Sequence, residues 1–434
     1  MNYKLSIIIP LYNAENFIRV AFASILNQTF GFQNLEIIMV NDASKDSTKE
    51  IINELASLYS NVVALHLNES SGAAGRPRNV GMEHATADYI MFLDQDDTYA
   101  DNACEVLYRL VVNKNIDIGM ATYRNVSEDN KIIDDCVLDS DFPLKINVDS
   151  IDQSEKLFYL SPSVWTKIFK KKFLEQNNIK FPEGIIGEDL VFITHAEMVA
   201  NGILFEKKVI YNYLVREKED KSLSHNYNKR FFEQSYYSIE EVFKIMKKYG
   251  RDKYFPIILE SHLDHHLYMM FKSESLTKTE KMEVFKRSDW FLSKCNQYGV
   301  FPKSDFYKIL FQKLVLNKYK EAIDFYNDSS FLIEKRDHWA KELSEGKNWL
   351  ESQLENYKLE VKNQNQVIKE LKEWNTKLIK DKEWFEDQIR NLKIEMNNQL
   401  QVLENFKKWN EELLEAKRWL EQRLEKNQIN EEGS

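Results

Sequence analysis

The stretch that most constrains the fold is residues 89–97, an apolar run that ends abruptly in acidic residues. It reads Tyr-Ile-Met-Phe-Leu and continues as Asp94-Gln95-Asp96-Asp97. A short apolar run that stops at a polar break predicts a buried strand, and open α/β sheets bind ligands beyond the carboxyl ends of their strands. The oxygens of Asp94 and Asp96 suit Mg²⁺ or Mn²⁺ bridged to a substrate phosphate. The alternative is a solvent-exposed turn that caps the next helix.

Composition excludes several classes of partner. The 434 residues suggest two or three domains, and the net charge of −10 argues against nucleic-acid binding. No apolar run approaches the roughly 18 residues of a transmembrane segment, and the first residues lack the layout of a signal peptide. Three cysteines without metal-type spacing indicate reduced thiols. We expect a cytoplasmic protein, or one peripheral at the inner face of the membrane.

Strand and helix patterns alternate over residues 1–125. Apolar runs predict strands at 5–9, 35–40, 62–67, 89–93 and 116–120, with Pro10 ending the first. Asn13 is a plausible N-cap of a helix that reaches Gln28. Such alternation with short links predicts parallel βαβ units with right-handed crossovers.

Polar residues follow three of these strands, and a parallel sheet would bring them to one edge. Asp42 can accept hydrogen bonds from a base or ribose, Tyr12 can stack on a base, and Arg78 can meet a phosphate as a bidentate fork. Taken singly, each is equally a helix cap or a turn residue. The absence of a Gly-x-Gly-x-x-Gly or Walker sequence argues against a dinucleotide redox cofactor and a P-loop nucleotide.

Together these motifs resemble family 2 glycosyltransferases with the GT-A fold. The matching segments are residues 7–13 (Ile-Ile-Ile-Pro-Leu-Tyr-Asn), 40–44 (Val-Asn-Asp-Ala-Ser), Arg78-Asn79 and 92–97 (Phe-Leu-Asp-Gln-Asp-Asp). The resemblance implies that the nucleoside of a sugar nucleotide contacts Pro10, Tyr12 and Asp42. It also implies that Asp94 faces the nucleoside-sugar side and that Asp96 binds Mn²⁺ or Mg²⁺.

Residues 126–225 read as the acceptor side, with a polar loop predicted at 126–153. Glu188-Asp189 opens a predicted helix, where acidic residues are favoured by the helix dipole. The functional alternative is a general base that takes the acceptor's proton. The resemblance implies that Asp189 is this base, with Glu188 beside it on the acceptor side. Trp165 can cover a sugar face or belong to the core.

A polar loop at 214–225 can supply a further metal or diphosphate ligand. Glu219, Asp220 and His225 are the candidates, and the alternative for His225 is simple exposure. Within the family, the chain most resembles the wall teichoic acid glycosyltransferases. This likeness is carried by residues 75–79 (Gly-Arg-Pro-Arg-Asn), 161–163 (Ser-Pro-Ser) and 167–169 (Lys-Ile-Phe). It ends near residue 225, without the β-rich C-terminal modules of those enzymes.

The remainder reads as helical. Four helices are predicted in a connector at 226–335, over 230–248, 254–271, 278–294 and 305–326, where His262, His265 and His266 suggest packing more than a metal site. Residues 336–434 repeat every 35 residues, which is five heptads, with an apolar seam typical of a coiled coil. Six of the eight tryptophans lie there, either widening the interface or meeting a partner. A long single helix cannot bury this seam alone, so we expect a homo-oligomer, with a parallel dimer first and a trimer second.

The sequence therefore predicts an α/β, Rossmann-like GT-A domain (1–225), a helical connector (226–335) and a coiled coil (336–434). The predicted activity is inverting, metal-dependent transfer of GlcNAc, Glc or a similar sugar from a UDP-sugar to a hydroxyl of a cell-envelope glycopolymer. The alternatives are a peptide or protein side chain as the acceptor, or a catalytically idle scaffold for an envelope-assembly complex.

Overall fold

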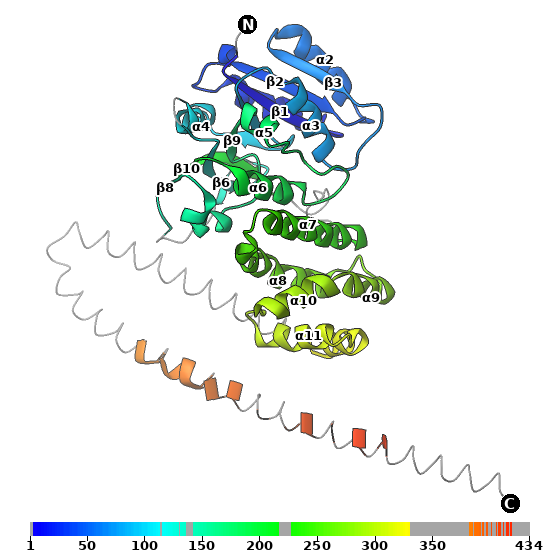
Figure 1. The fold of residues 1–434 in the computed structure, drawn as a ribbon. Helices are drawn as coiled ribbons and strands as arrows, with labels where there is room; N and C mark the ends of the chain where they lie inside the picture. Colours follow the sequence, from blue (N-terminus) through cyan, green and yellow to red (C-terminus); the bar gives the residue numbers. More distant parts are fainter. Residues whose placement is uncertain are drawn as a thin grey trace, which may run out of the picture. The chain divides into compact units, whose positions relative to one another are not determined.

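The computed structural model describes residues 3–112, 115–129, 131–135, 142–216 and 227–329, and scattered helical residues between 382 and 418. The chain divides into two compact units, Met1–Phe331 and Leu332–Ser434. The first unit contains an α/β part followed by a stack of helices, coloured blue to green and green to yellow (Figure 1). The sheet and the first helices of that stack thus belong to one unit.

The strands and helices of the first unit have the following bounds. The strands are β1 Leu5–Leu11, β2 Leu35–Asn41, β3 Val62–His66, β4 Tyr89–Phe92, β5 Thr98–Tyr99, β6 Ile118–Val126, β7 Ile132–Asp135, β8 Lys145–Val148, β9 Lys167–Lys170 and β10 Ile203–Leu214. The helices are α1 Ile18–Leu26, α2 Thr48–Leu58, α3 Gly75–His84, α4 Ala103–Val111, α5 Lys171–Gln176, α6 Glu188–Val199, α7 Lys229–Lys248, α8 Phe255–Lys272, α9 Lys278–Arg287, α10 Asp289–Tyr298 and α11 Asp305–Val315.

The sheet is mixed, with the order β3-β2-β1-β4-β9-β6-β10-β5. Strands β1 to β4 pair in parallel, as the βαβ pattern predicts. β6, the fifth strand expected in the parallel part, also runs in the direction of β4, but it does not pair with β4, because β9 lies between them and runs antiparallel to both. β9 runs opposite to β4 because residues 161–166 bring the chain to the carboxyl edge of the sheet before β9 begins.

Two cores cover the two faces of the sheet, and the alternation of side chains along β1 assigns them. Ile7 and Ile9 belong to the core that includes residues of α1, α2 and α4. Ile8, between them, belongs to the core that includes residues of α3, α5 and α6 and continues through α7 to α11. This period of two is the one expected of a strand buried on both faces.

Several predicted boundaries are corrected in the α/β part. Pro10 lies inside β1 and does not end it; the pairing of β1 with β4 stops earlier, at Ile8, so its missing N–H costs that ladder nothing. Asn13 is not a helix cap: it has φ 49°, its side-chain oxygen accepts from the Lys45 N–H at 2.9 Å, and α1 begins only at Ile18. The predicted polar loop at 126–153 contains β7 and β8, added to the edges of β6 and β10.

The helical part matches the prediction for α7 and α8 and corrects the two later helices. The helix predicted over 278–294 is broken at Ser288 into α9 and α10. The helix predicted over 305–326 is broken after Val315, and a further helical stretch runs from 319 to 329. Within the described residues, no helix is long and apolar enough to cross a membrane.

Among the histidines of α8, His266 packs in the core, as the sequence suggested, whereas His265 is exposed. His266 is buried among the rings of Tyr236 and Phe291, with ring centroids 5.4 and 5.7 Å away. Across the part of the chain that the structure describes, no cluster of three or more His, Cys, Asp or Glu side chains is arranged to hold a metal ion. Cys104 and Cys295 are buried free thiols, whereas Cys136 lies outside the described residues.

Almost all of the predicted coiled coil lies outside the described residues. Those that are described between 382 and 418 are helical. The repeated seam and the oligomer that it predicts therefore remain predictions.

Candidate active site at the carboxyl edge of the sheet

The centre of the site is Arg78, a buried arginine on α3 whose guanidinium group binds three carboxylates. Its Nη2 donates to Asp94 Oδ1 at 2.7 Å, and its Nη1 donates to Glu188 Oε1 at 3.0 Å. Nη1 also donates to Asp189 Oδ1. Only 3% of the Arg78 side chain is exposed. Residues more than 100 positions apart in the sequence are thus joined by one cation.

The local structure of α3 brings Arg78 to this position. Gly75 and Gly81 allow α3 to approach its neighbours closely, because an added Cβ would lie 2.3 Å from the Pro182 carbonyl oxygen and from an Ile8 methyl, respectively. The side chain of Asn79 exchanges two 2.9 Å hydrogen bonds with the main chain of Phe181. α3 is thereby attached to the loop that leads into α6.

Glu188 and Asp189 occupy the first turn of α6, as predicted. Gly187 precedes them in the left-handed conformation, with φ 86°, which glycine adopts without strain. The helix dipole favours both acids at this position, so the capping interpretation has a physical basis. Capping alone does not explain why both carboxylates bind Arg78. The start of α6 is therefore also part of the candidate site.

The electrostatics of Asp189 suit proton transfer near neutral pH. Burial raises the pKa of the Asp189 carboxyl to about 7; the Arg78 guanidinium opposes this rise, and Glu188 and Asp94 reinforce it. Burial also raises the pKa of Glu188, again opposed by Arg78. Burial alone would lower the pKa of Arg78, but Asp189, Asp94 and Glu188 raise it above its ordinary value. Arg78 therefore stays charged and keeps these acids together.

The carboxylate predicted to bind the metal, Asp96, pairs with Arg216 in this structure. The Arg216 guanidinium also lies over the Phe17 ring, 4.5 Å from its centroid. Burial raises the pKa of the Asp96 carboxyl, and Arg216 opposes this rise. Arg216 was not among the residues predicted for the site, although its place in the polar loop after β10 could have suggested it. His225, Glu219 and Asp220 lie outside the described residues.

Asp97 and Tyr211 were not predicted to have a role in the site. Together they attach the acidic turn to β10. The Tyr211 hydroxyl donates to Asp97 Oδ2 at 2.8 Å and accepts from the Asp94 N–H at 3.2 Å. The Leu214 N–H donates to Asp97 Oδ1 at 2.7 Å. Asp97 is therefore a buried anchor of the turn, while Asp94 and Asp96 remain at the edge of the site.

Trp165 packs within an aromatic group of the core. It stacks on Tyr211 with ring centroids 4.2 Å apart, meets Tyr123 edge-on at 4.8 Å, and is 7% exposed. Trp165 therefore belongs to the core, as one of its two interpretations predicted. Trp165 supports Tyr211 and through it the acidic turn, and contact of its ring with an acceptor sugar stays a prediction.

The residues predicted to hold the nucleoside lie at the ends of β1 and β2. Tyr12 is 41% exposed, and its main chain exchanges hydrogen bonds with the Gln95 side chain at 2.7 and 3.2 Å. Asp42 is buried and accepts from Ser70 Oγ at 2.9 Å and from the Ser71 N–H. Pro10 is buried in β1. Asp42 thus holds the loop before α3, and direct contact with a nucleoside remains a prediction for all three residues.

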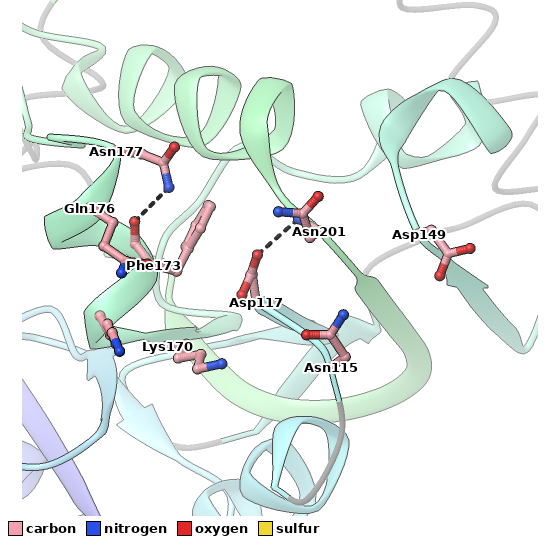
Figure 2. A pocket seen from close by; sticks show the side chains of 9 residues that line it. Asn115, Asp117, Asp149, Lys170, Phe173, Gln176, Asn177 and Asn201 are labelled. Atoms are coloured by element: carbon pink, nitrogen blue, oxygen red, sulfur yellow. Dashed lines mark hydrogen bonds between the residues drawn. The ribbon is translucent and has the colours of Figure 1, made fainter.

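A polar cavity of about 440 Å³ lies at the opposite edge of the sheet (Figure 2). Its lining includes Asp117, which precedes β6, and Asn201, which precedes β10; the Asn201 N–H donates to Asp117 at 2.8 Å. None of the predicted site residues lines it. The candidate site is therefore defined by the Arg78 cluster and not by this cavity.

Comparison with known proteins identifies relatives of the α/β part of the chain. Residues 6–164 match the model of glycosyl transferase family 2. The poly(ribitol-phosphate) beta-glucosyltransferase of Bacillus spizizenii is 30% identical over 296 residues, covering 66% of this chain and 44% of that protein. The poly(ribitol-phosphate) beta-N-acetylglucosaminyltransferase TarP of Staphylococcus aureus is 29% identical over 247 residues, covering 56% of this chain and 72% of that protein.

Among solved structures, S. aureus TarS residues 1–349 in complex with UDP-GlcNAc align with a TM-score of 0.59. The alignment is 22% identical and covers 75% of this chain and 92% of that chain. At this identity the likeness shows the fold, an α/β GT-A-like domain followed by helices. This chain spans less than half the length of the Bacillus relative. Residues 6–164 of this chain are a glycosyl transferase family 2 domain.

Proposed function

We propose that this chain is an inverting glycosyltransferase that moves a hexose or N-acetylhexosamine from a UDP-sugar to a hydroxyl group of a polyol-phosphate polymer of the cell envelope. The Arg78 cluster carries the proposal, because Asp94, from the predicted donor side, and Asp189, from the predicted acceptor side, bind one guanidinium group. The relatives named as poly(ribitol-phosphate) glucosyl- and N-acetylglucosaminyltransferases support this choice of sugar and polymer.

Asp189 is the general base in this proposal. Its carboxylate takes the proton of the acceptor hydroxyl while the hydroxyl oxygen attacks the anomeric carbon from the face opposite the diphosphate. The bond between the anomeric carbon and the diphosphate oxygen breaks, and its electron pair leaves with UDP. A base works best when its pKa lies near the working pH, and the pKa of Asp189, raised to about 7 by burial, meets this condition.

The acidic turn fits a divalent cation by the chemistry of its donors. Carboxylate oxygens are the ligands that Mg²⁺ and Mn²⁺ prefer, and Asp96 lies at the edge of the site with Asp94 nearby. A cation bound there would stabilise the negative charge of the leaving diphosphate. Because Arg216 pairs with Asp96 in this structure, a cation bound there would compete with Arg216 for the same carboxylate.

A test combines a donor screen with two site variants. UDP release is measured with UDP-GlcNAc and UDP-Glc, with Mn²⁺ or Mg²⁺, against a ribitol-phosphate polymer and against peptides. Asp189→Asn should retain UDP binding and lose transfer by about 10²–10⁴-fold, the usual contribution of a general base. Asp96→Ala should abolish metal-dependent transfer. Asp101→Asn, at an exposed carboxylate away from the cluster, is the control.

The outcomes separate the parts of the proposal. An unchanged rate in Asp189→Asn would place the base elsewhere, and metal-dependent turnover in Asp96→Ala would defeat the metal assignment. Transfer to peptides but not to the polymer would change the acceptor class. Failure to bind or hydrolyse either UDP-sugar would favour a catalytically idle scaffold.

A further inference from the structure

Lys167 is a buried lysine on β9 that binds the main chain just before it. Only 1% of this residue is exposed. Its Nζ donates to the carbonyl oxygens of Ser161 and Ser163 at 2.7 and 2.6 Å and lies 3.3 Å from Thr166 Oγ1. An ammonium group has three protons and accepts none, so each proton has an acceptor. The charged form of Lys167 is the one that fits these contacts.

The Ser163 carbonyl and the Val164 N–H belong to the same peptide group. In a planar trans peptide these two groups point in opposite directions. The Val164 N–H donates to Asp189 Oδ2 at 3.3 Å. This single peptide group therefore lies between the ammonium group of Lys167 and the carboxylate of Asp189.

We infer that Lys167 is a positioning residue of the active site, whose ammonium group acts through the Ser163–Val164 peptide to orient Asp189 and to stabilise its carboxylate. The inference rests on the proposed role of Asp189 as the general base. A cation on the carbonyl oxygen polarises the peptide and strengthens its N–H as a donor, since hydrogen bonds in a chain reinforce one another. The second carbonyl bond, to Ser161, holds the preceding turn in place.

Charged groups from four elements act on Asp189. Arg78 from α3 binds Oδ1 and is shared with Glu188 of α6 and with Asp94, which follows β4. The contact from Val164 serves the other oxygen, Oδ2. Lys167 of β9 and Asp189 also interact electrostatically. Arg78 and the Lys167-bound peptide thus hold the two oxygens of one carboxylate from different sides.

A buried acid on α6, Glu197, supplies a counter-charge for Lys167. Burial lowers the pKa of Lys167, while Glu197 and Asp189 raise it. Burial raises the pKa of Glu197, while Lys167 lowers it. Burial has the larger effect on both groups, bringing the pKa of Lys167 down and the pKa of Glu197 up to about 8, and against this effect each group favours the charged form of the other.

The test compares Lys167→Met with Lys171→Met in the full-length chain. Lys171 of α5 also donates its Nζ to a main-chain carbonyl, that of Ala85 at 2.6 Å, but that bond does not lead to Asp189. In Lys167→Met we expect kcat to fall about 10–100-fold while KM for the UDP-sugar changes less than about twofold. The acid limb of its kcat–pH profile should move to higher pH by about half a unit or more, because a cation that favours the carboxylate is lost. Lys171→Met should leave the profile in place.

A direct readout of Asp189 separates this inference from the proposed function. Titration of the Asp189 carboxyl carbon is followed by ¹³C NMR and assigned through its disappearance in Asp189→Asn. A titration that does not shift in Lys167→Met overturns the inference, whatever the activity. A shifted titration with an unshifted rate profile supports the positioning role and overturns the role of Asp189 as base.

A second variant covers the case in which Lys167→Met does not fold. Removing one buried charge leaves its partner uncompensated, whereas removing both is tolerated far better. Lys167→Met/Glu197→Gln removes the lysine and its counter-charge together. The same two readouts apply to it, with Glu197→Gln alone as the control, and an Asp189 titration equal to that control overturns the inference.

Discussion

Arg78→Met should destabilise the first unit in a manner that depends on pH. The side chains have similar length, but the substitution leaves Asp94, Glu188 and Asp189 without their cation. Hydrogen bonds to charged groups contribute about 1.5–3 kcal/mol each, and the three carboxylates are 28, 14 and 22% exposed, so each regains some hydration. We therefore expect a loss of about 3–5 kcal/mol in the free energy of unfolding, typical of a buried pair that loses one partner.

The pH dependence of this loss follows from Asp189. Burial already raises its pKa to about 7 while Arg78 opposes the rise, so removing Arg78 raises the pKa further. A carboxyl group whose pKa is higher in the folded state than in the unfolded state reduces stability as pH rises toward its folded value. Well below pH 7 the Asp189 carboxyl is protonated in both proteins. Above that pH it loses its proton readily in the native protein, whereas in the variant the higher pKa makes this loss cost more of the free energy of folding. The deficit should therefore be larger at pH 9 than at pH 6.

Urea unfolding followed by circular dichroism at these two pH values measures the effect. The control is Arg109→Met, which removes an exposed ion pair with Glu206 whose N–O distance is 3.0 Å. Exposed pairs contribute about 0–1 kcal/mol. A deficit in Arg78→Met no larger than in this control, or one equal at pH 6 and pH 9, would show that Arg78 does not hold the three carboxylates together.

Three further predictions concern other parts of the molecule. Tyr211→Phe removes the hydroxyl that binds Asp97 and the Asp94 N–H. It should lower the free energy of unfolding by about 1–3 kcal/mol and raise KM for the UDP-sugar. The control Tyr99→Phe, which loses a hydrogen bond to the Phe92 carbonyl, should leave KM unchanged. Burial, with His262 and His265, lowers the pKa of His266 well below 6.5, so stability should fall as pH drops below about 6.5; His266→Phe should reduce this slope in thermal unfolding measured from pH 7.5 to 5. Truncation after Phe331, the boundary of the first unit, should convert a dimer or trimer into a monomer in light scattering. An unchanged number of subunits would place the interface outside the repeats.

The motifs at the ends of the strands could be found in the sequence because each is local. The run that ends at Asp94, the acids that open α6 and the parallel order of β1 to β4 all follow from patterns within about 30 residues. The boundaries of α9 and α10 could not be found this way, since the break at Ser288 interrupts a continuous helical pattern. The antiparallel direction of β9 was also hidden, because four residues carry no sign of the neighbours they will pair with.

The sequence by itself determined the family of the domain, the acidic turn after β4 and the identity of Asp96 and Asp189 as candidates, because residue type and spacing are enough for these. Only the tertiary structure decided which groups act on them. Arg78 binds Asp94, Glu188 and Asp189, Arg216 pairs with Asp96, and Lys167 reaches Asp189 through one peptide group. These partners lie between 16 and 120 positions apart along the chain. The distances between them are decided by the packing of α3 and α6 against the sheet and by the place of β9 within it, and no local pattern encodes these.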